Sequence, residues 1–325
     1  MSVSLAKAFD DGVDAARRGW RGVVCYVLVK WAFVGCLGVL FLGTVAAALW
    51  TGFNKAVPAS LIGSIHKLLS SLREAAASHG GDTSSALSAA FQGQPAFHWG
   101  GALAVFFAGG AVLLCLGLAG HVWGEAAKAS YVARLVSGGS PRWMEFFAGG
   151  NRFFWRSLRL LGLYAVLTLL LMIAWIAPAA VLGITAGKAG VAAAVFWIAA
   201  GLVALVYVMT RWSFGLSSLV VSDLSPRESL RRSWSATRGA FWRAFGLFAL
   251  YLAAFCGLEI GCLLAGWLLI RSLGAAGVVL TQITVYGVNY FGGFALYGML
   301  ISFYMQRTES DGGFDPEGDS TGISF

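Results

Sequence analysis

Six long apolar runs constrain this sequence more than any other feature. They cover residues 23–49, 101–122, 160–182, 191–210, 245–270 and 277–304. Each is long enough to cross the hydrocarbon core of a bilayer, which takes about 20 residues of helix. Backbone amides in hydrocarbon must find partners within their own segment, and these runs do not alternate every second residue as barrel strands do. The sequence therefore predicts an all-α polytopic membrane protein with six transmembrane helices.

The scarcity of charge supports this fold class. Only 12% of the residues are charged, whereas about a quarter of a soluble domain is charged. We therefore expect one helical membrane domain over residues 1–306. A net charge of +8 would indicate nucleic acid as the partner of a soluble protein. Here the basic residues lie in short segments between apolar runs, so we expect no nucleic-acid partner.

The distribution of Lys and Arg predicts the orientation in the membrane. Seventeen lie before the first run, between runs two and three, between runs four and five, or after the sixth run, against five in the other connecting segments. Basic residues favour the cytoplasmic side, so both termini are expected there. Residues 51–98 then form an extracytoplasmic loop, whose leucine stripe predicts a short amphipathic helix. The acidic, glycine-rich residues 307–325 are expected to be a disordered tail.

The basic segments resemble one another. The letters SPR at 140–142 precede FFWR at 153–156, SPR at 225–227 precedes FWR at 241–243, and GWR stands at 19–21. Each segment is followed by two apolar runs. We therefore predict three parallel two-helix repeats, about 1–135, 136–222 and 223–306. Each would open with a cytoplasmic amphipathic helix, which we call an elbow helix. Convergence is the alternative, since aromatic residues and arginine favour the interface in any membrane protein.

The elbow helices carry the candidate lipid contacts. These are Arg21, Arg142, Arg156, Arg227, Arg243, Trp155 and Trp242. Arginine at this depth can bind headgroup phosphate, although plain anchoring explains the same pattern. Ser225, Pro226 and Glu228 match the S-x-x-E capping box with proline at the first helical position, which predicts a helix start.

Polar residues inside the apolar runs are the second candidate site. Glu259 lies near the middle of the fifth run, too deep for its side chain to reach the interface. On the sixth run, Gln282, Tyr286 and Asn289 share one helical face. An antiparallel hairpin would place Glu259 and Asn289 at matching depth. Two interpretations stay open: a polar contact between helices, or a proton or solute site in a cavity.

Enzyme motifs are absent from the sequence. No nucleophile elbow, P-loop or zinc-binding HExxH motif occurs, and the four histidines and five cysteines are scattered. We therefore predict no catalytic residues, no metal site and no cofactor.

The segment from 211 to 246, RWSFGLSSLVVSDLSPRESLRRSWSATRGAFWRAFG, resembles the membrane domain found with some bacterial glycerophosphodiester phosphodiesterases and similar bacterial membrane families. The earlier ARLVSGGSPRWMEFF…FFWR stretch looks like the same device. In those enzymes the catalytic domain is a separate soluble barrel, which this sequence lacks. The resemblance therefore implies a bacterial membrane module of six to eight helices without the activity.

Two functional hypotheses follow. The first is a non-catalytic integral inner-membrane protein that serves as a scaffold or accessory in a membrane or lipid-related process, with membrane lipid as its partner. The second is a small transporter or channel with its site at Glu259 and Asn289. A homo-oligomer, or another membrane protein as partner, stays open under either hypothesis.

Overall fold

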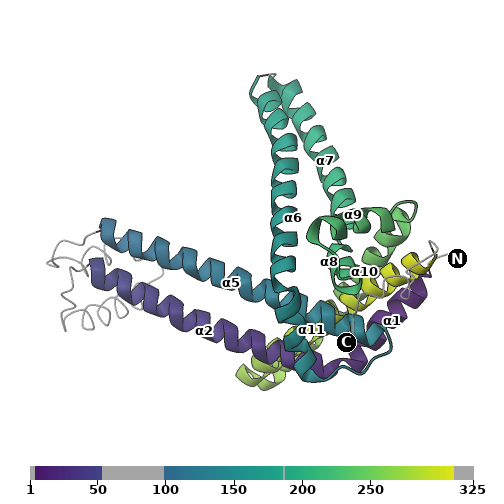
Figure 1. Cartoon of the computed structure of the whole chain (residues 1–325). Helices are drawn as coiled ribbons and strands as arrows, with labels where there is room; N and C mark the ends of the chain where they lie inside the picture. The colour runs from purple at the N-terminus through teal and green to yellow at the C-terminus, as the bar shows by residue number, and fades with distance from the viewer. Residues whose placement is uncertain (1–3, 53–98, 186, 311–325) are drawn as a thin grey trace. The chain divides into compact units, whose positions relative to one another are not determined.

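The computed structural model describes residues 4–52, 99–185 and 187–310, and regular structure in these ranges is entirely helical. The helices are labelled in Figure 1. They are α1 (Leu5–Arg18), α2 (Trp20–Gly52), α5 (Trp99–Val136), α6 (Trp143–Thr185), α7 (Gly187–Trp212), α8 (Gly215–Val221), α9 (Pro226–Ala236), α10 (Phe241–Leu273) and α11 (Ala275–Ser310). The predicted all-α class is confirmed.

Five helical stretches in the described ranges are long and apolar enough to cross a membrane. They are Trp20–Thr51, Gly100–Val136, Trp143–Ile184, Ala189–Val221 and Phe241–Leu273. In each stretch, only 6 to 11% of the residues in an apolar 18-residue segment are buried within the protein. The apolar side chains that remain exposed therefore need lipid around them. The chain is therefore a multi-pass integral membrane protein. The sixth predicted span falls within α11, which is not among the five because Gln282, Asn289 and several tyrosines make it less apolar.

Residues Trp31–Leu118 form one compact unit. Its described part consists of α2 from Trp31 onward and α5 up to Leu118, which lie side by side in Figure 1. A Cβ atom at Gly109 would touch Thr44, and one at Gly117 would touch Leu37. Residue numbers rise on one helix as they fall on the other, so the two are antiparallel. Most of the predicted extracytoplasmic loop, with its predicted amphipathic helix, lies outside the described residues.

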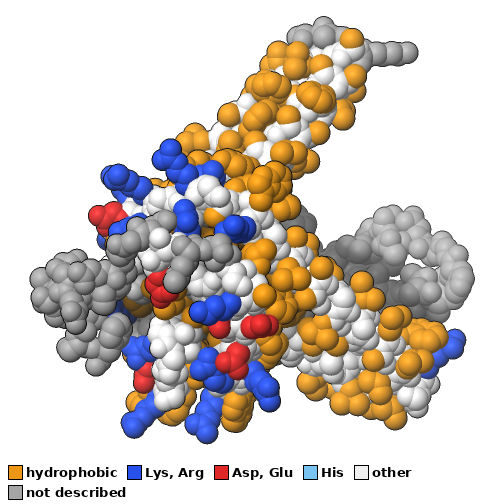
Figure 2. Space-filling model, turned by 90° about the vertical axis from the view of Figure 1, so that its right-hand side faces the viewer, with side chains coloured by type: hydrophobic (Ala, Val, Ile, Leu, Met, Phe, Trp, Pro, Cys, Tyr) orange, Lys and Arg blue, Asp and Glu red, His pale blue; other side chains and the backbone are white. Residues whose placement is uncertain are grey.

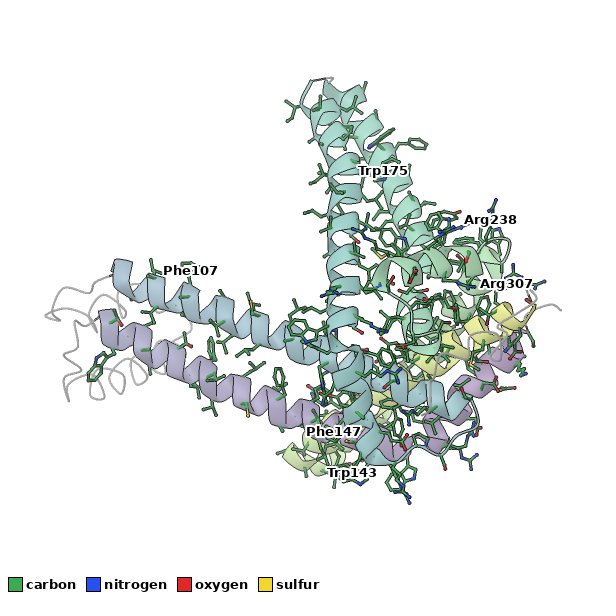
Figure 3. All side chains as sticks on the ribbon, in the orientation of Figure 1. Phe107, Trp143, Phe147, Trp175, Arg238 and Arg307 are labelled. Atoms are coloured by element: carbon green, nitrogen blue, oxygen red, sulfur yellow. The ribbon has the colours of Figure 1, made fainter. Side chains whose placement is uncertain are left out.

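The second unit comprises residues Met1–Lys30 and Ala119–Phe325. It contains two helical hairpins, α6 with α7 and α10 with α11. The turns between their helices use Gly187 at φ 59° and Gly274 at φ 58°, a backbone region that glycine adopts without steric cost. In the first hairpin the Trp175 ring lies 4.8 Å from that of Trp197 across the interface (Figure 3).

The helix α1 packs along α11 within this unit. Its buried positions are Ala8, Gly12, Ala15 and Ala16, small residues that let two helix backbones approach closely. A Cβ atom at Gly298 would lie 2.7 Å from the Cα of Gly12. The Ser302 hydroxyl also donates to Asp11 Oδ2 at 2.6 Å. The first elbow helix thus docks on protein along its small residues, while Leu5, Phe9 and Val13 are only partly buried.

The other two elbow segments differ from each other. The third contains the separate helix α9, where Ser225 and Glu228 form the predicted capping box and Pro226 begins the helix. In the second, α6 runs without a break from Trp143 through the apolar stretch to Thr185, so no separate elbow helix precedes that span. A four-residue turn, by contrast, separates α9 from α10. This break after α9 contains Gly239 at φ 76°, a backbone conformation outside the α-helix.

The C-terminal helix continues beyond the predicted start of the tail, since α11 ends at Ser310. The Arg307 guanidinium donates to the carbonyl oxygen of Arg238 at 3.3 Å (Figure 3). Residues 311–325, the remainder of the predicted tail, lie outside the described ranges. Figure 2 shows Lys, Arg, Asp and Glu side chains gathered together on one face, below the hydrophobic side chains of the α6–α7 hairpin.

Candidate functional site: a buried ion pair and a basic interface

A buried ion pair lies on α5. Lys128 and Glu125 are one turn apart, with Lys128 Nζ 2.9 Å from Glu125 Oε1 and 2.8 Å from Oε2. The Lys128 side chain is 8% exposed and that of Glu125 is 20% exposed. Both residues belong to a helical stretch that is long and apolar enough to span the membrane. Each charge therefore depends on its partner, because a single buried charge in this setting would be costly.

Aromatic side chains from two other helices complete this site. The Tyr26 hydroxyl of α2 donates to Glu125 Oε1 at 2.9 Å. The Lys128 ammonium lies 5.0 Å from the centre of the Tyr26 ring and 4.8 Å from that of Tyr297 on α11. A cation over an aromatic face is attracted by the ring quadrupole, most strongly where water is excluded. The pair thus joins α2, α5 and α11 through polar contacts.

A second lysine lies beside this cluster. The Lys30 ammonium is 5.7 Å from the centre of the Tyr26 ring and 5.1 Å from that of Tyr290. A Cβ atom at Gly293 would lie 3.3 Å from Lys128 Nζ, so the absence of a side chain there leaves room for the ammonium. With Lys30, Lys128 and Glu125 all ionised, the cluster carries one positive charge in excess.

A second polar centre surrounds Asp223, in the link between α8 and α9. Arg156 donates to Asp223 Oδ1 at 2.6 Å and to its carbonyl oxygen at 3.1 Å. Arg152 donates to Oδ2 at 3.1 Å. Asp223 has a φ of 50°, an uncommon conformation that Asp tolerates better than most residues. These bonds fix the link against α6.

The predicted intramembrane residues lie on the α10–α11 hairpin. Glu259 on α10 and Asn289 on α11 are equally spaced from Gly274, at the hairpin turn. However, the Asn289 amide donates to the Val285 carbonyl of its own helix at 3.1 Å, and no hydrogen bond joins it to Glu259 in the described part of the chain. Glu259 is half-buried, whereas Gln282, Tyr286 and Asn289 are exposed. A role for this set stays a prediction.

The predicted interfacial residues mostly reach the surface. Exposed side chains are those of Arg21, Arg142, Arg227, Arg243, Trp155 and Trp242. Arg156 is half-buried because it binds Asp223. The Arg21 guanidinium lies 5.7 Å from the centre of the Trp20 ring. Exposed tryptophan and arginine at the ends of apolar helices are typical of the membrane–water interface.

Glu125 and Lys128 are not predicted as a site from the sequence. The predicted second span ends at Val122, just before them, and Lys128 counts among the basic residues of the connecting segment. In the structure α5 continues to Val136. A signal was available: Glu and Lys spaced three apart form helical ion pairs, and only small residues stand between these two.

The described residues contain no group of three His, Cys, Asp or Glu side chains that could hold a metal ion. Comparisons of the chain with family models, with curated proteins and with solved structures found no match.

Proposed function

We propose that this protein is a non-catalytic integral protein of the bacterial inner membrane, serving as a scaffold or accessory in a lipid-related process. It would hold anionic phospholipid along a belt of Trp–Arg pairs at its cytoplasmic side. In this proposal α11 is the sixth span and both termini are cytoplasmic.

One observation carries the proposal: an exposed tryptophan directly precedes an arginine in each predicted repeat. The pairs are Trp20–Arg21, Trp155–Arg156 and Trp242–Arg243. The three tryptophans are 59%, 65% and 78% exposed. The first and third pairs open the apolar helices α2 and α10. Tryptophan favours headgroup depth and arginine favours anionic phosphate, so each pair suits a lipid surface.

The same pairs support the three-repeat arrangement. In each repeat the pair is followed by two long helices: α2 with α5, α6 with α7, and α10 with α11. Superposing 140–205 on 225–304 tests the relation. Parallel repeats should align both hairpins with the same hand, whereas a fit only after inversion would contradict this part of the proposal.

The lipid proposal is tested by measuring which phospholipids stay bound to the purified protein in native mass spectrometry. We expect more bound phosphatidylglycerol than phosphatidylcholine from an equal mixture. The double variant Arg21→Gln/Arg243→Gln should lose this preference. Arg271→Gln is the matched control, because Arg271 also lies over a tryptophan ring, 4.5 Å from that of Trp267, but at the opposite end of α10. Equal retention in the double variant and the control would refute the proposal.

A small transporter or channel is the second candidate function, and the buried pair Glu125–Lys128 favours it. Ionisable groups inside spanning helices often mark proton or ion pathways. The same experiment tests the site predicted from the sequence at Glu259 and Asn289. In proteoliposomes with a pH-sensitive dye, a transporter should lose proton flux on Glu125→Gln or Glu259→Gln while it still folds. Vesicles with the unaltered protein that show no flux above empty vesicles would exclude proton transport.

A further inference from the structure

A cleft of about 510 Å³ lies within the second unit, at the end of α5 that leads into α6. Its walls come from the last turns of α5, the connecting segment, the first turns of α6 and the end of α8 with the link that follows. This volume lies within the range of small-molecule sites in proteins. The side chains of Trp143 and Trp155, on the same part of α6, are exposed, and exposed tryptophan is typical of headgroup depth in membrane proteins.

Opposite charges alternate around this cleft. Arg134 pairs with Glu145, and Arg152 pairs with Asp223. All four residues line the cleft, and their formal charges cancel. Each of these side chains is between 27% and 44% exposed, so both ends of each pair are within reach of a ligand.

The carboxylates of Glu145 and Asp223 also accept hydrogen bonds from residues other than their arginine partners in the cleft. Glu145 Oε1 accepts from the backbone N–H of Arg142 at 3.3 Å. Asp223 is held by Arg156, which does not line the cleft. The Tyr131 hydroxyl donates to the Pro141 carbonyl at 3.3 Å and fixes the connecting segment. The acceptors are therefore positioned without a ligand, which lowers the ordering cost of binding one.

The rest of the cleft lining combines three serines, Ser130, Ser137 and Ser140, with apolar residues. The apolar residues include Phe153, which is 6% exposed, together with Val220 and Val221. A cleft lined by both paired charges and apolar side chains fits an amphipathic ligand.

We propose that this cleft binds the headgroup of a zwitterionic aminophospholipid, a phosphate diester that carries a primary ammonium group. The phosphate would accept hydrogen bonds from Arg134 and Arg152, and the ammonium would donate to Glu145 and Asp223. Arginine matches phosphate oxygens in geometry, and charge-assisted bonds are the strong ones. A ligand with only a negative charge would be repelled by the two carboxylates, and one with only a positive charge by the two guanidinium groups. A zwitterion can instead pair its phosphate with the arginines and its ammonium with the carboxylates.

The inference deepens the proposed function, on which it rests, by naming a second lipid class at a separate site. The Trp–Arg belt selects for negative charge, while the cleft selects for an ammonium that donates hydrogen bonds. Phosphatidylcholine is the discriminating comparison, because its quaternary ammonium has the same charge but no N–H donor.

The test measures binding of short-chain phosphatidylethanolamine, phosphatidylcholine and free phosphoethanolamine to the purified full-length protein by isothermal titration calorimetry. We expect phosphatidylethanolamine to bind about tenfold more tightly than phosphatidylcholine, as expected for one charge-assisted bond. Glu145→Gln should remove this preference. Glu228→Gln is the matched control, since it removes the same charge from an exposed glutamate outside the cleft. Thermal melting of each variant verifies that it is folded.

Each outcome decides a specific point. Equal binding of the two phospholipids, or an unchanged preference in Glu145→Gln, overturns the cleft inference. If phosphatidylglycerol is still retained through Arg21 and Arg243, the proposed function survives that failure. If free phosphoethanolamine binds as tightly as the phospholipid, the cleft takes a soluble zwitterion and the lipid assignment is wrong. Should neither anionic nor zwitterionic lipid bind, both proposals fail.

Discussion

Lys128 and Glu125 form an ion pair 2.8 Å long in the last third of a helical stretch that is long and apolar enough to span a membrane, and the ammonium lies against two tyrosine rings from other helices. The Tyr26 hydroxyl binds the carboxylate of the same pair. In a membrane, an apolar side chain gains little free energy when it moves from lipid to a contact with another helix, because both surroundings are apolar. Hydrophobic burial therefore does little to select one helix register over another. This pair is directional, so it specifies how α2 and α11 meet α5.

Removing one partner of the pair should be strongly destabilising. Glu125→Leu leaves the Lys128 ammonium buried without its counterion, which typically costs about 3–5 kcal/mol. We expect a lower melting temperature in detergent micelles for this variant. The double variant Glu125→Leu/Lys128→Met should recover most of the loss, because it leaves no buried charge. Glu259→Gln is the control on another apolar helix, α10, and it should keep the fold because glutamine retains the hydrogen-bonding capacity of the side chain. Equal melting temperatures for Glu125→Leu and the unaltered protein would contradict this prediction.

The close approach of α1 to α11 predicts that two glycine-to-alanine substitutions on α11 change the stability in opposite directions. Gly298→Ala places a Cβ atom 2.7 Å from the Gly12 Cα, so α1 must shift, at a typical cost of about 1–3 kcal/mol. Gly287→Ala makes the same substitution on α11 with nothing within 4 Å of the new Cβ atom. It should be neutral or stabilising, because alanine favours helix over glycine. Limited trypsin cleavage after Arg17 and Arg18 should accelerate only in Gly298→Ala. Equal cleavage rates in the two variants would show that α1 does not depend on this contact.

Sequence patterns predicted the fold class well and the interhelical contacts poorly. Apolar length identified the spanning helices because bilayer thickness sets it directly. The capping box at Ser225 was predictable because it depends on residues three positions apart. The Tyr26–Glu125 contact joins residues far apart in the chain, and no local periodicity encodes such a pairing. Glu145 and Asp223 were missed for the same reason, since their arginine partners come from other segments.

The packing of α1 depends on residues that an amphipathic pattern does not reveal. Leu5, Phe9 and Val13 are partly buried against the core. Ala8 and Gly12 are buried, and Gly12 contacts α11. Small residues contribute little to an amphipathic pattern, yet they permit the closest backbone contact.

The capping box of α9 predicts a dependence on pH. Two hydrogen bonds lower the pKa of Glu228 below its ordinary value. The Ser225 hydroxyl has the larger effect, and the Ser225 backbone N–H has the smaller one. A carboxyl group whose pKa is lower in the folded state stabilises the fold above its unfolded pKa, and this contribution is lost as the pH falls through the folded pKa. Hydrogen exchange in α9 should therefore become faster, relative to Glu228→Gln at the same pH, below pH 4.5, the ordinary value for this group. The glutamine variant keeps the hydrogen-bonding groups without the charge, so it corrects for the intrinsic effect of pH. A constant ratio between the two proteins would refute this role.

Orientation is tested most directly by cysteine labelling in intact cells. The five native cysteines are first replaced, and single cysteines are then introduced at Ser84, Ser272, Ser140 or Ser235. Ser84 lies in the predicted extracytoplasmic loop, outside the described residues, and Ser272 is exposed near the C-terminal end of α10, which is predicted to face the same side. Ser140 and Ser235 are exposed in the two basic segments.

Basic residues are retained on the cytoplasmic side. A membrane-impermeant maleimide should therefore label cysteines at positions 84 and 272 in intact cells, and those at positions 140 and 235 only after the cells are opened. The reverse pattern would overturn the orientation. Labelling of Ser272 from the inside alone would show that α10 does not cross the membrane, and would remove α11 as the sixth span.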